Sequence, residues 1–190
     1  MVNCQVVSMM VLKQALNKYH SRLTLDFLAG LIDGDGSFNV TFQIKPYKRV
    51  RVNFTVVQSC REVLNELKTF FSCGNVYDLP SNASRFQVEN VDILLNYIKP
   101  VLDKLKLNTY KSEMYLIAMK VCEIIKLKGN KSNDSLKEII ELAYNSNKLG
   151  KRRRISKEEL LAKLERQDNS IMSKGLKNYY LPKLDLKLKV

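Results

Sequence analysis

The most regular feature of the chain is an alternation of apolar and polar residues between positions 38 and 56. Apolar side chains occupy every second position in two runs, which are Phe38, Val40, Phe42 and Ile44, and then Val50, Val52, Phe54 and Val56. A period of two is typical of a β-strand that buries one face. Pro46 and Tyr47 lie between the runs, so the pattern predicts a long antiparallel hairpin with a turn at these residues.

A helical pattern precedes this hairpin. Thr24 has a side chain that is favoured at helix N-caps, and it precedes the apolar segment 25–34. Glycine interrupts helices, so we expect this helix to break at Gly34 and Gly36.

The segment after the hairpin predicts a second hairpin between helices. Residues 61–71 have helical spacing, and two shorter strands are expected near 74–79 and 84–89, with the turn PSNA between them. Further helices are expected over 91–106 with an interruption at Pro100, and over 110–127, 134–145 and 156–167.

This order of elements predicts an α+β fold. It reads helix, hairpin, helix, hairpin, helix, with a four-stranded antiparallel sheet, helices on one face of the sheet, and additional C-terminal helices. We expect an N-terminal extension at 1–20, a core domain at 21–145, and a basic C-terminal extension and tail at 146–190.

The net charge of the chain indicates what class of molecule it associates with. The 190 residues include 32 Lys and Arg against 19 Asp and Glu, a formal net charge of +13. An excess of this size favours association with a polyanion, nucleic acid before an anionic membrane surface. No run of 18 apolar residues occurs, so we expect no transmembrane helix and no membrane partner.

The polar side of the first predicted hairpin has the composition of a DNA-reading surface, because it carries amides, hydroxyls and basic groups but no acid. Arg pairs with guanine in the major groove, Asn or Gln pairs with adenine, and a two-stranded ribbon fits that groove. A solvated strand surface is the alternative. The residues expected to contact DNA from this face are Asn39, Thr41, Gln43, Lys45, Arg49, Arg51, Asn53 and Thr55, with Arg85 and Gln87 on the last strand.

The segment LAGLIDGDGSF at 28–38 places two aspartates, Asp33 and Asp35, at the end of the first predicted helix. A helix C-terminus disfavours negative charge, so a cation is expected to compensate. An EF-hand loop beginning at Asp33 would need glycine and glutamate where Phe38 and Ile44 stand. A zinc site is not expected either, because the chain has four cysteines without a CxxC pair and one histidine.

The same helix carries small residues at positions that favour a close helix partner. Gly30 and Gly34 are four residues apart and therefore share one face. Small residues let two helix backbones approach closely. If the partner helix also ended in aspartate, two carboxylates would converge, and divalent cations could neutralise them while activating water at a phosphodiester.

With these residues in place, the segment FLAGLIDGDGSF resembles the signature of the LAGLIDADG homing endonucleases. It differs from the string that names the family only at Gly34, where that string has alanine. The resemblance extends over residues 20–127 and includes one copy of the motif. Single-motif members act as homodimers on pseudo-palindromic DNA, so the resemblance implies a homodimer interface formed by Leu28, Ala29, Gly30, Ile32 and Asp33.

The resemblance also implies the chemistry of the site. Asp35 would be the metal-binding carboxylate and the carbonyl of Gly34 a second ligand for Mg²⁺, for which Mn²⁺ can substitute. Asp33 would hold the end of the helix. Gln58 and Arg61 in VVQSCR and Lys111 in NTYKSEMY would surround the catalytic water.

The function implied is that of a site-specific DNA endonuclease encoded by a group I intron, which makes a double-strand break and so spreads its host intron. The basic run Lys151, Arg152, Arg153 and Arg154 would contact phosphates. One alternative is a maturase with the same fold that binds its host intron RNA and cuts little or no DNA. A DNA-binding regulator without catalysis is another. An organelle, chloroplast before mitochondrion, is the expected location, and a bacterial cytoplasm is the alternative.

Overall fold

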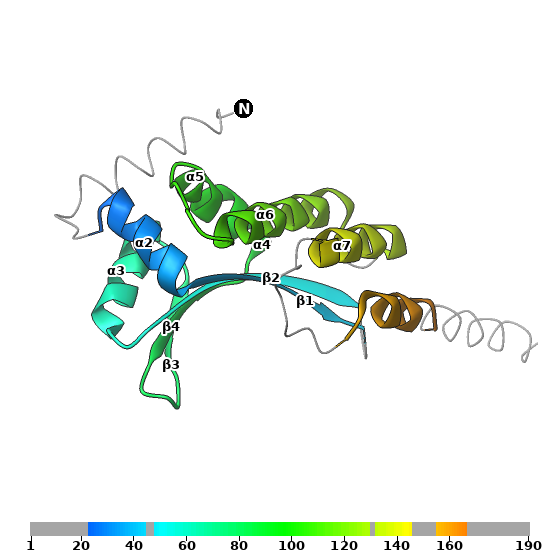
Figure 1. Ribbon diagram of the computed structural model, residues 1–190, viewed down its shortest axis with the longest axis horizontal. Helices are drawn as coiled ribbons and strands as arrows, with labels where there is room; N and C mark the ends of the chain where they lie inside the picture. The colour runs from blue at the N-terminus through cyan, green and yellow to red at the C-terminus, as the bar shows by residue number, and fades with distance from the viewer. Residues whose placement is uncertain (1–22, 45–47, 130–131, 146–154, 167–190) are drawn as a thin grey trace, which may run out of the picture.

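The structure is a computed structural model that describes residues 23–44, 48–129, 132–145 and 155–166. It confirms the predicted α+β architecture (Figure 1), in which the helices lie on one face of a single antiparallel sheet. None of the helices in these ranges is long and apolar enough to cross a membrane.

The sheet contains four strands in the order β1-β2-β4-β3, and each neighbouring pair is antiparallel. The long β1–β2 hairpin is present as predicted, and in its register Phe38 lies opposite Phe54 and Val40 opposite Val52. The strands are β1 Gly36–Gln43, β2 Arg49–Gln58, β3 Asn75–Asp78 and β4 Ser84–Val88.

The helices differ from their predicted bounds by a few residues at most, except after residue 90. They are α2 Leu25–Asp35, α3 Arg61–Phe71, α4 Val91–Ile93, η1 Leu94–Ile98, α5 Lys99–Leu102, α6 Lys111–Lys128 and α7 Asn133–Asn145, followed by a helix at 157–166.

The prediction of one helix over 91–106 is wrong in detail. The segment winds as a wider π-type turn at η1, where the N–H of Lys99 donates to the carbonyl of Leu94 five residues earlier. Pro100 follows immediately and has no N–H to continue the ordinary ladder, which accounts for the change in winding. The helical segment ends at Leu102 instead of continuing to 106.

The prediction that α2 breaks at Gly34 is also wrong. The helix begins where expected, with the N–H of Phe27 donating to the Thr24 hydroxyl at 3.2 Å, but it continues through Gly34 to Asp35. Gly36 is the residue that ends it. A Cβ at Gly36 would lie 2.6 Å from the carbonyl oxygen of Ile32 and 2.9 Å from its Cγ2, so only glycine fits where the chain leaves the helix for β1.

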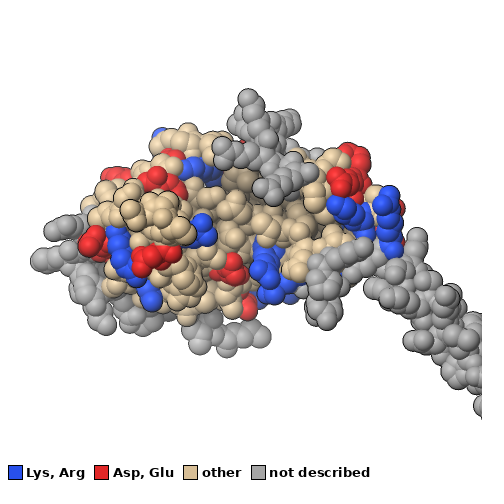
Figure 2. Space-filling view, turned by 90° about the horizontal axis from the view of Figure 1, so that it is seen from below, with Lys and Arg blue, Asp and Glu red and all other residues tan. Residues whose placement is uncertain are grey.

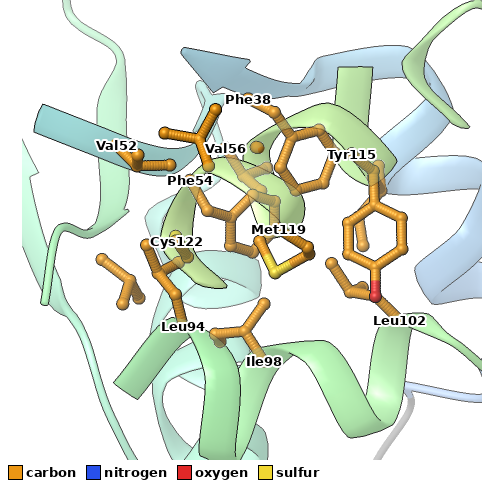
Figure 3. Packing of buried hydrophobic residues seen from close by; sticks show 14 of the residues in the cluster. Phe38, Val52, Phe54, Val56, Leu94, Ile98, Leu102, Tyr115, Met119 and Cys122 are labelled. Carbon is orange, nitrogen blue, oxygen red and sulfur yellow. The ribbon is translucent and has the colours of Figure 1, made fainter. Parts of the chain in front are cut away.

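The core lies between the sheet and its helical layer (Figure 3). The even-numbered residues of β2, from Val50 to Val56, are all buried, as the alternation predicted. Phe38 stacks on Phe54 with ring centroids 4.9 Å apart, and Tyr115 of α6 lies 5.4 Å from Phe38. These aromatic contacts attach α6 to the hairpin.

The helix at 157–166 belongs to the same packed unit. Its Leu160 and Leu164 are buried in the hydrophobic cluster that contains the sheet residues. The hydroxyl of Tyr144 in α7 donates to the carbonyl of Ile155 at 2.9 Å. The packed core therefore extends at least to residue 164.

Candidate active site

The end of α2 and the end of β2 meet at the carboxylate of Asp35. Asp35 is the last residue of α2 and is exposed. The side-chain amide of Gln58, the last residue of β2, donates to Oδ2 of Asp35 at 2.6 Å. The Oε1 atom of Gln58 accepts the N–H of Ser59 at 3.0 Å, which fixes which end of the amide faces the carboxylate. The structure thus joins two of the predicted catalytic residues directly.

Lys111 approaches the same site from α6. It is the first residue of that helix, it is buried with 9% of its surface exposed, and its ammonium donates to the carbonyl oxygen of Gly34 at 2.5 Å. Gly34, predicted as a metal ligand, and Lys111, predicted as a catalytic residue, therefore contact each other directly. The positive charge of Lys111 therefore lies at the residue that immediately precedes Asp35.

Asp33 connects α2 to the segment that precedes α6. Its Oδ2 accepts the N–H of Asn108 at 2.7 Å, and its Oδ1 accepts the hydroxyl and the N–H of Thr109 at 2.7 and 3.3 Å. Desolvation raises the pKa of Asp33, but the hydrogen bonds from Asn108 and Thr109 outweigh it, so the pKa lies below its usual value. Asp33 is ionised at neutral pH.

Arg61 does not join the group around Asp35. It is the first residue of α3, and its guanidinium pairs with the carboxylate of Asp78 at the end of β3. The same carboxylate oxygen accepts the Ser84 hydroxyl at 2.8 Å. Nothing in the structure brings Arg61 to the carboxylate of Asp35, although Arg61 follows Gln58 by three residues.

The face of α2 that points away from the core is lined by glycine. A Cβ on Gly30 or on Gly34 would meet nothing within 4 Å in the described part of the chain. Leu28 and Ile32, by contrast, have no exposed surface because they pack into the core. The surface that α2 leaves for a second copy is therefore narrower than predicted and excludes these two side chains.

The polar face of the sheet is open in the described structure. Figure 2 looks onto it from below and shows a largely uncharged middle, with both basic and acidic side chains on either side. Asn39 and Asn53 are opposite each other and share a hydrogen bond of 3.2 Å. Among the described residues, Arg49, Arg51 and Arg85 have no carboxylate partner, so their guanidinium groups remain available to a ligand.

Some predicted contact residues have different surroundings. Thr55 lies between Ser37 and Gln87 on the polar face of the sheet, as predicted, but only 8% of its surface is exposed. Gln87 donates to Glu89, just beyond the end of β4, at 2.6 Å. The predicted contacts at Lys45 and at Lys151, Arg152, Arg153 and Arg154 lie outside the described residues.

The assembled motif has a counterpart among known proteins. The family model described as LAGLIDADG endonuclease matches residues 28–122, half of the chain. The chain belongs to the LAGLIDADG endonuclease family. The matched segment extends from α2 into α6 and contains Asp35, Gln58 and Lys111.

Curated relatives carry related names. The probable intron-encoded DNA endonuclease 1 of Mycosarcoma maydis is 40% identical over 109 residues, which are 56% of this chain and 40% of the relative. The homing endonuclease I-ApeII of Aeropyrum pernix is 26% identical over 144 residues, which are 71% of this chain and 86% of the relative. The chain thus spans less than half the length of the first relative and most of the second.

Solved structures of LAGLIDADG proteins share the fold. I-SmaMI bound to cleaved DNA superposes with a TM-score of 0.63 at 29% identity, covering 67% of this chain and 45% of I-SmaMI. I-CvuI in a complex with DNA superposes with a TM-score of 0.65 at 24% identity, covering 77% of this chain and 96% of I-CvuI. At that identity, the likeness to I-CvuI shows the fold alone.

The pattern of residues did not predict the exposure of three apolar side chains of this LAGLIDADG chain. Phe27 is 47% exposed and lies three residues before Gly30 in α2. Val57 and Tyr77 are 37% and 50% exposed on the polar side of the sheet, both opposite Arg85. Continuing the alternation of β2 beyond Thr55 would have identified Val57.

Proposed function

We propose that this chain is a site-specific homing endonuclease that makes a metal-dependent double-strand break in a long, pseudo-palindromic DNA target. The observation that carries the proposal is the exposed Asp35 carboxylate at the end of α2. It accepts a hydrogen bond from Gln58, and Lys111 binds the carbonyl of the preceding residue, Gly34. The names of the relatives support it, since I-ApeII is called a homing endonuclease. The solved I-SmaMI complex contains cleaved DNA.

The donors at the site fit a hard divalent cation such as Mg²⁺. Magnesium is usually held by one or two carboxylates together with substrate phosphates and water. Asp35 offers an exposed carboxylate, and the carbonyl oxygen of Gly34 beside it has a second lone pair besides the one that accepts Lys111. When bound, the cation would supply Lewis acidity and a more acidic water for phosphodiester hydrolysis, and Mn²⁺ offers similar chemistry.

The side chains around Asp35 have separate roles in this proposal. Gln58 holds the carboxylate in one orientation through its amide N–H. Lys111 supplies positive charge that offsets the charge developing on the scissile phosphate. Arg61, paired with Asp78, would have to leave this partner before it could contact the phosphate.

A homodimer would complete the site. Within the described residues, no three His, Cys, Asp or Glu side chains gather in a group that could hold a metal. A second copy packed on the open Gly30–Gly34 face of α2 would bring a second Asp35 close to the first. The twofold symmetry of such a dimer matches a pseudo-palindromic target.

The sheet of each subunit would then read the major groove on one side of the break. Arg49, Arg51 and Arg85 offer guanidinium groups suited to guanine, and Asn39 and Asn53 offer amides suited to adenine. The net charge of +13 predicts an affinity that falls steeply with salt, because each phosphate contact releases counterions. The run Lys151–Arg154 would add to these contacts.

The proposed context is a group I intron of an organelle genome, with a bacterial genome as the alternative. The name of the Mycosarcoma relative, a probable intron-encoded DNA endonuclease, supports an intron origin. A second candidate function is that of a maturase that binds host intron RNA. The intact Asp35, Gln58 and Lys111 favour the nuclease, because RNA binding alone does not require them.

One experiment separates the two functions. The full chain is incubated with Mg²⁺ and a duplex that carries the intron insertion site, and in parallel with the intron RNA. Site-specific cleavage of both DNA strands supports the endonuclease, and an unrelated duplex serves as the control. Tight RNA binding that promotes splicing, with the DNA left intact, would favour the maturase instead.

A further inference from the structure

The loop before α6 is attached to the end of α2 by an unusually complete set of hydrogen bonds. Both oxygens of Asp33 are used, by the N–H of Asn108 and by the N–H and hydroxyl of Thr109. These partners are 75 and 76 residues away along the chain. Both N–H groups belong to residues that precede Tyr110, the N-cap of α6, so the carboxylate holds the loop that leads into the helix.

Thr109 links this carboxylate to Lys111. Its hydroxyl proton is donated to Asp33 at 2.7 Å, and the same oxygen accepts the backbone N–H of Lys111 at 3.3 Å. The residue adjoining α6, Tyr110, contributes no side-chain cap. Thr109 therefore caps the first N–H of α6, and Asp33 of α2 holds Thr109 in place.

The position of this cap decides where the Lys111 ammonium lies. Lys111 is 9% exposed, and its Nζ is 2.5 Å from the Gly34 carbonyl. A shift of one residue in the start of α6 would turn the side chain by about 100°. The charge of Lys111 also helps to lower the pKa of Asp33, so the two groups interact electrostatically as well as through Thr109.

We propose that Asp33 and Thr109 act as a positioning pair, which holds the first turn of α6 so that the Lys111 ammonium remains at the Gly34 carbonyl beside Asp35. Neither residue needs to contact the DNA for this role. The inference rests on the proposed function only where cleavage is the readout. A merely structural role, in which the contacts stabilise the loop without directing Lys111, is the rival explanation.

The first test requires neither DNA nor catalysis. An amine-acylating reagent is applied to the folded full chain, and modification of Lys111 is measured by mass spectrometry against exposed Lys120 on the same helix. We expect Lys111 to react slowly in the wild type, and Thr109→Val and Asp33→Asn to raise its relative reactivity by about fivefold or more. Thr109→Ser, which keeps the hydroxyl, should resemble the wild type.

The second test is the single-turnover cleavage rate on duplex DNA. A misplacement of about 1 Å at a catalytic group can cost on the order of 100-fold in rate, so Thr109→Val should slow cleavage at least about tenfold while DNA affinity changes less than about threefold. In a Lys111→Met background, Thr109→Val should have no further effect. Asp26→Asn, on an exposed acid of the same helix, is the charge-matched control.

The outcomes distinguish the two explanations. Unchanged Lys111 reactivity in folded Thr109→Val and Asp33→Asn, or an equal loss of rate with and without Lys111, would overturn the positioning role. If Thr109→Val fails to fold, the comparison of Asp33→Asn with Asp26→Asn decides. If the wild-type chain cuts no duplex, the proposed function fails, and the acylation result alone determines whether the pair positions Lys111.

Discussion

The side-chain amide of Gln58 donates to the carboxylate of Asp35 at 2.6 Å, joining the last residue of β2 to the last residue of α2. The contact connects β2, on the sheet proposed to face DNA, to α2, whose open glycine face is the proposed contact with a second copy. It therefore couples the proposed DNA-reading surface to the proposed metal-binding carboxylate. A substitution at Asp35 that removes the charge but keeps an oxygen acceptor for Gln58 should therefore affect chemistry while preserving this contact.

We expect Asp35→Asn to abolish cleavage and spare binding. The substitution preserves size and an oxygen atom but removes the negative charge that a divalent cation needs. The single-turnover rate should fall by at least about 100-fold, while the affinity for the same duplex, measured in Ca²⁺, should change less than about threefold. Asp26→Asn is the control. Cleavage that survives in Asp35→Asn would mean that another group holds the metal.

Arg51 offers a test of base recognition. It lies on the polar face of β2 opposite Thr41 and has no carboxylate partner among the described residues. Arg51→Lys keeps the charge but loses the two-pronged pairing with guanine, so discrimination at one base pair of each half-site should fall by about 1–3 kcal/mol. Competition binding with singly substituted duplexes measures this change. Lys68→Arg, on the exposed side of α3, should leave the profile unchanged.

The open face of α2 provides a test of self-association. A Cβ at Gly30 meets nothing within 4 Å in the described chain, and larger residues suit a helix interior better than glycine by up to about 1 kcal/mol. Gly30→Leu should therefore leave the fold intact but prevent close helix packing. Sedimentation should show about twice the chain mass for the wild type and one chain mass for Gly30→Leu.

Two controls support that comparison. Gly30→Ala, with a smaller side chain, should give intermediate association. Asn65→Leu, at an exposed position of α3, adds the same apolar group elsewhere and should leave the dimer unchanged. A wild-type chain that sediments as a monomer yet cleaves DNA would contradict the homodimer.

The sequence predicted the sheet well because its signal is local. The alternation in β1 and β2 determines which side chains are buried, and the registers Phe38–Phe54 and Val40–Val52 follow from the short connection between the strands. The same rule placed Thr55 on the polar face but did not show its low exposure between Ser37 and Gln87 of the neighbouring strands. A pattern along one strand contains no information about such cross-strand cover.

The candidate site was predictable only through the resemblance of its motif. Composition and spacing drew attention to Asp33 and Asp35, but not to their partners. The contacts of Asp33 with Thr109 and of Gly34 with Lys111 join segments more than 70 residues apart, and no periodicity reports such pairs. The pairing of Arg61 with Asp78 was not predicted either, because no periodicity indicates that these two side chains meet.

The two glycines that end the motif should respond differently to alanine. Gly36→Ala would place a Cβ 2.6 Å from the Ile32 carbonyl oxygen, an approach that requires the backbone to move, and should destabilise the chain by about 1–3 kcal/mol. Gly34→Ala meets no atom within 4 Å in the described chain and restores the string that names the family. It should be neutral or stabilise the helix by up to about 1 kcal/mol. Urea unfolding measures both, and equal effects would contradict the close-contact explanation.

Acid should weaken the attachment of α2 to the loop before α6 through Asp33. Hydrogen bonds from Asn108 and Thr109 to the carboxylate overcome desolvation and lower its pKa in the folded chain. The unfolded chain therefore binds a proton at higher pH than the folded chain does. Because the unfolded state binds more protons in that range, stability falls as pH decreases. The contribution of Asp33 is complete at neutral pH and is lost as pH falls below about 5 and through the lowered pKa.

Unfolding of the wild type and Asp33→Asn, measured between pH 7 and pH 3, checks this sign. The variant cannot ionise at position 33, so it should be less stable at pH 7, and the difference should shrink as pH falls. Asp26→Asn, which lacks the contacts to Asn108 and Thr109, should follow the wild type closely. A difference between the wild type and Asp33→Asn that remains constant with pH would show that the hydrogen bonds at Asp33 do not depend on its charge.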